Sequence, residues 1–190
     1  MSWYPDRQQA WELLKQYNHS DALLRHALAV EGVMRHFAGL YAGSNADEWG
    51  LAGLLHDLDY ERFPEQHCKK TDDILRALDC DPRIVHAIIS HGYGLCSDVR
   101  PESNLELVLY TIDELTGLIN AAALMRPSHS VMDLELSSLK KKFKTPSFAA
   151  GVNRDVIRQG ASWMGWDLDK VMEETILGMR SVASEIGLAG

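Results

Sequence analysis

The sequence predicts an all-α protein, and the periodicity of its 190 residues is the main reason. Apolar residues recur at spacings of three and four along most of the chain, which is the period of an amphipathic helix. No convincing run shows the alternation of apolar and polar residues that marks a half-buried strand. The clearest helix follows Ser20 and ends near Gly43. Its apolar stripe contains Leu23, Ala27, Val30, Met34 and Phe37.

The remaining helices follow in chain order, and turn signals such as "FPE", "CDP", "HGYG" and "RPS" separate them. A first helix is expected at about residues 6–18, ahead of the helix that follows Ser20. The later helices are expected at about residues 46–57, 65–79, 82–91, 103–125, 153–164 and 167–187. Residues 126–150 are the least helical stretch. The chain shows no internal repeat, low-complexity tract or flexible linker, so residues 1–190 are expected to form one domain.

Composition narrows the classes of function. The formal net charge of −8 argues against a protein that binds long nucleic acids or anionic membranes, because such proteins usually carry a basic surface. The N-terminus lacks a signal-peptide pattern, and no stretch approaches the roughly 18 apolar residues of a membrane span. Three cysteines without zinc-finger spacing are expected to be plain thiols in a reducing compartment. We therefore expect a soluble, cytoplasmic protein.

Several histidines lie on inward faces of the expected helices. His26 shares the stripe of Leu23 and Val30, and His56 lies one turn after Ala52 on another helix. His67 opens a further helix, and His91 closes the one that presents Ile84 and Ile88. A single histidine on an apolar face is more often a hydrogen-bonded core residue than a ligand, because buried polar groups are usually satisfied. The interpretation as ligands therefore depends on the whole set.

Two aspartates complete this set. Asp113 shares a helical stripe with Leu109 and Thr116, where an unpaired carboxylate would be very unfavourable. An arginine or lysine could be its partner, but the inward stripes offer imidazoles. Asp57 follows His56 directly and points about 100° further round the same helix end. Imidazoles and carboxylates that converge from separate helices form a set of donors typical of divalent transition-metal sites.

The ordered set resembles the HD-domain superfamily of metal-dependent phosphohydrolases in its two-metal form, over roughly residues 20–120. The stretches "DELTGLI" and "KKKFKTPSFAAGVNRDVI" further resemble small predicted HD-type hydrolases of undefined substrate. The resemblance implies a helical bundle with a C-terminal helical extension at about residues 126–190. It also implies one or two divalent ions, with iron, manganese, zinc, nickel, cobalt and magnesium not distinguished. The implied ligands of the first ion are His26, His56, Asp57 and Asp113. The implied ligands of the second are His67, His91 and a bridging Asp57.

Some positions depart from the pattern of this superfamily. Thr71 stands four residues after His67, where the two-metal subgroup has glycine. Tyr60 stands where many two-metal phosphodiesterases have lysine, three residues after the motif aspartate. Its neighbours Asp59 and Glu61 are candidates for acid–base work in catalysis or for support of the ligands. The alternative is that both are solvent-facing charges after a helix end.

A phosphorylated substrate needs positive docking groups, and the sequence offers few. The segment "SLKKKFK" contains Lys141 and Lys142, which could supply point charges for phosphate if residues 126–150 cover the metal site. The alternative is a solvated basic face. Arg154 follows "GVN" at an expected helix start and could grip phosphate with its planar guanidinium. Arg126 is a weaker candidate.

The sequence therefore predicts a metal-dependent phosphohydrolase that acts on a small phosphorylated metabolite or nucleotide through a metal-activated water. Two alternatives from other classes stay open. The same scaffold supports di-iron oxygenases in this superfamily, and a module that keeps its metal without turnover could bind a nucleotide in regulation. The sequence does not indicate an oligomeric state.

Overall fold

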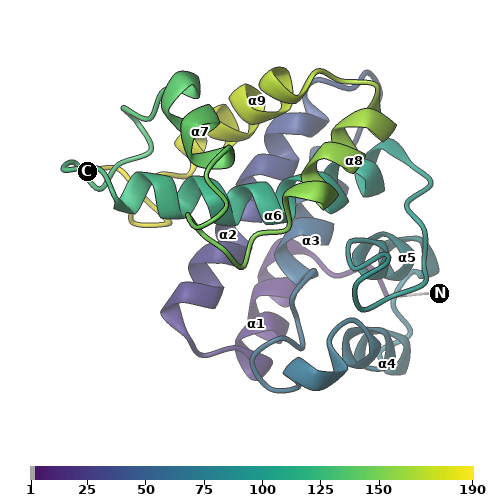
Figure 1. Ribbon diagram of the computed structural model, residues 1–190. Coiled ribbons are helices and arrows are strands. Elements are labelled where there is room, and N and C mark those ends of the chain that lie inside the picture. Colours follow the sequence, from purple (N-terminus) through teal and green to yellow (C-terminus); the bar gives the residue numbers. More distant parts are fainter. Residues whose placement is uncertain (1–2) are drawn as a thin grey trace.

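The computed structural model describes residues 3–190, and within them the protein is all-α, as predicted (Figure 1). The helices are α1 Arg7–Tyr17, α2 Asp21–Ala38, α3 Ala46–Leu55, α4 Lys69–Ala77, α5 Pro82–Ser90, α6 Asn104–Leu124, α7 Leu136–Phe143, α8 Arg154–Met164 and α9 Leu168–Ser181. A short 3-10 helix, η1 Pro64–Gln66, precedes α4. Two isolated bridges are the only strand-like pairings in the described part of the chain.

The expected helices are present, with ends displaced by a few residues at most positions. The last one is shorter than expected, because α9 ends at Ser181 and turns follow it. Residues 126–150 are sparsely helical, as expected, but they contain the short helix α7, which was not predicted separately from the sequence. That helix buries Leu139 and Phe143, which lie four residues apart and share one face. Its other face carries the lysine run, which hides the short apolar stripe from a pattern search.

Helices α2, α3 and α6 form the centre of the fold, with α8 and α9 packed against α6 and α2 on one side (Figure 1). Buried apolar side chains from α1 to α9 belong to one continuous core. The contact between α2 and α3 is close enough that it requires Gly53. A Cβ atom at Gly53 would lie 3.0 Å from the backbone oxygen of Val30 and 3.1 Å from the nitrogen of Glu31. This contact brings the end of α3 against the face of α2 that carries His26.

Helix α6 is the one described helix that is long and apolar enough to cross a membrane by length and composition alone. Within the fold, 61% of its most apolar window is buried. It packs against α2, α3, α5, α7, α8 and α9. Its apolar character is therefore that of a core helix, and it carries Asp113 into the middle of the structure.

Candidate metal centre

The four histidines and two aspartates singled out in the sequence come together, although they derive from distant parts of the chain. His26 is on α2, His56 caps the C-terminus of α3, and Asp57 follows it. His67 lies between η1 and α4, and His91 caps the C-terminus of α5. Asp113 lies near the middle of α6. Helix ends supply three of the six, so their side chains reach past the backbone into one shared space.

The first group of donors consists of His26, His56 and Asp113. The Nε2 atom of His26 lies 2.9 Å from Oδ1 of Asp113 and 3.2 Å from Nε2 of His56. The Nε2 atom of His56 is also 3.3 Å from Oδ1 of Asp113. These three side chains therefore direct their donor atoms at one position.

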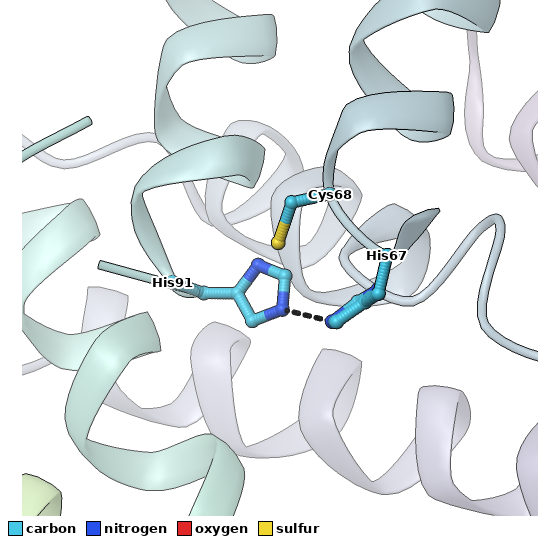
Figure 2. Close-up of side chains that lie close together, drawn as sticks. All are labelled: His67, Cys68 and His91. Atoms are coloured by element: carbon cyan, nitrogen blue, oxygen red, sulfur yellow. Dashed lines mark hydrogen bonds between the residues drawn. The ribbon is translucent and has the colours of Figure 1, made fainter. Parts of the chain in front are cut away.

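The second group consists of His67 and His91, whose Nε2 atoms face each other at 3.2 Å (Figure 2). Asp57 lies between the two groups. Its Oδ2 atom is 3.3 Å from Nε2 of His56 and 3.8 Å from that of His26. Its Oδ1 atom is 3.4 Å from Nε2 of His67 and 3.8 Å from that of His91. Each carboxylate oxygen of Asp57 thus serves a different pair of histidines.

Hydrogen bonds at the opposite ring nitrogens determine what these imidazoles can do. The Nδ1 atom of His56 donates to the carbonyl oxygen of Gly53, and that of His91 donates to the carbonyl of Ile88. Because a carbonyl oxygen only accepts, both Nδ1 atoms carry hydrogen. The neutral form of each ring then has its lone pair on Nε2, directed at the shared space. Partners of this kind orient histidines that bind metals, so the donor set fits a divalent metal ion.

Burial and mutual charge shift the pKa values of the group strongly in the metal-free protein. Burial alone would raise the pKa of Asp57 and Asp113, but the attraction of His56 outweighs it and lowers both. Burial likewise opposes the charged form of His56, yet Asp57 and Asp113 raise its pKa well above the usual value. Burial also lowers the pKa of His91, and the neighbouring His56 lowers it further. His56 therefore keeps a proton at Nε2, the atom that would bind a metal ion, and metal binding would release this proton.

Asp59 is fully buried and lies behind the donor atoms, outside the cavity. Its Oδ1 atom accepts a hydrogen bond from Nδ1 of His67 at 2.8 Å, and its Oδ2 atom accepts from the backbone nitrogen of Thr71 at 2.8 Å. Burial lowers the pKa of His67, but the bond to Asp59, together with the neighbouring Cys96 and Asp57, outweighs burial and raises this pKa to about 10. Instead of contacting substrate as an acid or base, Asp59 orients His67. Two roles were expected for Asp59, acid–base catalysis and the orientation of a metal ligand. Its contact with His67 agrees with the second role.

Glu61 also has a position different from that of a catalytic group. Its Oε2 atom accepts hydrogen bonds from the backbone nitrogens of His19 at 2.6 Å and Ser20 at 2.9 Å. These bonds lower the pKa of its carboxyl group. They satisfy the start of α2, where the Ser20 side chain makes no capping bond. Glu61 therefore anchors the helix that carries His26 and does not line the cavity.

The expected substrate-binding cations also lie elsewhere. Arg154 donates to the backbone oxygens of five residues, which are Phe143, Thr145, Phe148, Ala149 and Val152. All three of its nitrogens are engaged, so the guanidinium holds the segment between α7 and α8 in place of contacting a phosphate. Lys141 is exposed, and Lys142 lies 4.5 Å over the ring of Phe148. Neither lysine lines the cavity at the metal centre.

A sulfur donor near the second group was missed in the sequence, where the cysteines were taken as plain thiols. Cys68 is buried, and its Sγ atom lies within 4.8 Å of one ring nitrogen each of His67 and His91 (Figure 2). Cys96 is close by, because a Cβ atom at Gly92 would be 2.3 Å from its sulfur and 2.4 Å from that of Cys68. Two features of the sequence could have indicated this sulfur donor. Cys68 follows His67 directly, and the residue after His91 is Gly92, which leaves room for both sulfur atoms.

A cavity of about 490 Å³ opens over the centre and is bordered by five of the six donors. Its other walls include Tyr60, Leu95, Val152 and Val156. Glu114, which the sequence analysis did not single out, also lines it, and Oε2 of this residue accepts from the backbone nitrogen of Asn153 at 2.9 Å. Burial raises the pKa of Glu114. Among the described residues that border this cavity there is no lysine or arginine.

The other histidines do not join the centre. His36 lies 2.7 Å from a carboxylate oxygen of Glu174, and His86 lies 3.0 Å from one of Glu106. His86 and Glu106 border a larger surface hollow of about 670 Å³, which contains none of the six donors. This hollow therefore lies apart from the candidate chemistry.

Comparison with protein-family models, with curated proteins and with solved structures found no match for this chain. The candidate site therefore rests on the geometry of its own residues: nitrogen, oxygen and sulfur donors that lie close enough together to hold a metal ion.

Proposed function

We propose that this protein is a metal-dependent phosphohydrolase of the HD type, which uses two divalent metal ions to hydrolyse a small phosphorylated metabolite or nucleotide. The observation that carries the proposal is the position of Asp57, whose two oxygens face separate histidine pairs. A carboxylate that bridges two ions is a recurrent feature of two-metal hydrolytic sites. In this proposal His26, His56 and Asp113 hold the first ion, and His67 and His91 hold the second.

When bound, the two ions would supply a nucleophile from water at neutral pH and neutralise charge on a phosphoryl oxygen. The chain has the complementary task of orienting the ligands and excluding bulk water. Gly53, Ile88 and Asp59 hold three imidazoles through their Nδ1 atoms. Leu95, Val152 and Val156 give the cavity an apolar wall beside the donors. No lysine or arginine is among the described residues that line this cavity, so the metal ions themselves would balance the charge of the phosphate.

Within this proposal, Glu114 is the candidate proton donor to the leaving group. It is the carboxylate that lines the cavity beyond Asp57 and Asp113, and only its Oε2 atom has a protein partner. Burial raises its pKa, which favours the protonated form that a general acid needs. Replacement of Glu114 by glutamine should slow hydrolysis of an alkyl phosphate roughly 100-fold or more. Hydrolysis of p-nitrophenyl phosphate should change much less, because nitrophenolate leaves without protonation.

The decisive experiment is a screen for phosphate release from phosphorylated metabolites and nucleotides, under anaerobic conditions, with protein reconstituted separately with each candidate metal. The proposal expects metal-dependent phosphate release that is abolished in Asp57→Asn and retained in His86→Ala. His86→Ala is a matched control, because this residue also lies on α5 but pairs with Glu106 outside the cavity. A fully metal-loaded protein that releases phosphate from no substrate would contradict the proposal.

A second candidate function is a di-iron oxygenase, and the lining without lysine or arginine is the observation that favours it. A phosphohydrolase usually binds its substrate phosphate with basic side chains as well as with its metal ions, whereas an oxygenase needs no basic side chain for this purpose. Iron-loaded protein that consumes oxygen with an organic substrate, and releases no phosphate without oxygen, would support this candidate over the hydrolase.

A further inference from the structure

A second, smaller cavity lies beside the metal centre, between α2 and α6. Its volume is about 160 Å³, and His26 borders both cavities. Arg25, Thr116 and Asn120 form its polar side, and Ile186 and Leu188 are among the residues of its apolar side. Thr116 and Asn120 follow Asp113 by three and seven residues, so the same face of α6 passes from the metal centre to this cavity.

The polar groups of this cavity lack the partners that such groups normally have. Thr116 is 1% exposed, and its Oγ1 atom is one of two buried side-chain polar atoms without a hydrogen bond among residues 3–190. Most buried polar atoms in proteins are satisfied, so an unpaired hydroxyl that lines a cavity indicates a missing partner. The Nδ1 atom of His26 also has no partner in the described chain, unlike the Nδ1 atoms of His56, His67 and His91.

Arg25 is unusual among the arginines of the protein. Each of the other ten contacts a carboxylate, a backbone carbonyl or an aromatic ring. Within residues 3–190, Arg25 has no such partner; the residue is exposed, and its Nη1 atom lies 3.0 Å from where a Cβ of Gly187 would be. The lining of this cavity includes no aspartate or glutamate among the described residues, whereas the cavity over the metal centre includes three. The two neighbouring cavities therefore have opposite electrostatic character.

We propose that this second cavity binds a small organic carboxylate, a ligand that goes beyond the proposed hydrolase function. The carboxylate would accept hydrogen bonds from Arg25 on α2 and from the Thr116 hydroxyl on α6. When Nε2 of His26 holds a metal, Nδ1 of this ring carries the hydrogen and would donate to the same carboxylate. The apolar body would lie against Ile186 and Leu188. The volume of about 160 Å³ suits a ligand of few non-hydrogen atoms. A carboxylate at Nδ1 would give His26 the support that His67 has from Asp59, so it would strengthen the first metal position.

The test titrates butyrate into metal-free protein, where direct ligation to a metal is excluded, and follows binding by NMR. Saturable binding is expected in the wild type, weakened at least 10-fold in Arg25→Gln and also weakened in Thr116→Val. Arg100→Gln is the matched control, because Arg100 lies over the ring of Trp163 outside both cavities and its loss removes the same charge. Unchanged binding in Arg25→Gln, or no saturable binding in the wild type, would overturn the proposal.

Two further measurements separate the parts of the inference. Inorganic phosphate carries charge but no apolar body, so it should bind more weakly than butyrate; equal binding would overturn the assignment to an organic acid. In zinc titrations, butyrate should raise the zinc affinity of the wild type but not that of Arg25→Gln, because coupling between two sites is reciprocal. A zinc affinity that butyrate raises equally in both proteins would refute the link through His26. Far-UV circular dichroism checks that each variant is folded.

Discussion

Replacement of Asp57 by asparagine tests whether one carboxylate serves both metal positions. The substitution keeps the size of the side chain but removes its charge, and one of its two oxygens becomes an NH₂ group that cannot bind a metal. In the structure, the Asp57 oxygens lie 3.3–3.8 Å from the Nε2 atoms of the four histidines, so a metal held by either pair would be close to this charge. The substitution should therefore weaken binding at both positions.

The size of the effect follows from the electrostatics. A unit charge pair about 4 Å apart contributes about 4 kcal/mol at an effective dielectric constant of about 20. Since about 1.4 kcal/mol corresponds to a factor of ten, the affinity at each position should fall roughly 1,000-fold or more. In contrast, His91→Ala removes a neutral donor from the second position only, and should leave one metal per chain. His86→Ala should leave both metals in place.

The assay is competitive titration with a chromophoric zinc chelator, together with elemental analysis of the metal content per chain. Thermal unfolding of each metal-free variant shows whether the fold survives, so that loss of metal is not confused with loss of structure. If folded Asp57→Asn bound two zinc ions with the affinity of the wild type, Asp57 would not bridge, and the two-metal mechanism would be wrong.

Three further predictions follow from the same structure. In zinc titrations, Asp59→Asn should lower the affinity of the second metal position roughly 10- to 100-fold and leave that of the first unchanged, because the variant loses the carboxylate that orients His67. Glu61→Gln should change the zinc affinity of neither position. Arg154→Gln should lower the free energy of unfolding by about 3 kcal/mol in urea titrations, through lost bonds to backbone carbonyls, yet leave zinc affinity unchanged; a large loss of activity without a loss of stability would contradict this. In metal-free protein, protonated His67 has a pKa raised to about 10, so its stabilising contribution is complete below its unfolded value near 6.5 and is lost as pH rises through 10. The raised pKa of His56 acts in the same direction, whereas the Cys96 thiol, whose pKa is lowered to about 5, offsets one of these two contributions. The free energy of unfolding should therefore fall between about pH 7 and about pH 9 without zinc, and a flat profile in urea titrations over this range would contradict the assignment.

Local periodicity was enough to predict most of the helices and most of the donor residues. A helical stripe shows which residues face inward, so His26 and Asp113 could be recognised as inward-facing polar groups without knowledge of their neighbours. The adjacency of His56 and Asp57 at a helix end was likewise visible in the sequence. The short helix α7 was missed because only Leu139 and Phe143 are buried on it, and a stripe of that length is lost beside a run of lysines.

What each charged side chain contacts was decided by the tertiary structure. Asp59 and Glu61 are two residues apart in the chain, yet one is buried behind His67 and the other is exposed at the start of α2. Arg154 looked like a phosphate ligand at a helix start, but its five carbonyl partners are placed by the path of the chain after α7. The sequence determined which residue types and helix faces were available, because helical periodicity is local. The packing of helices distant in the chain determined which donors meet, because those contacts depend on distances that no local pattern encodes.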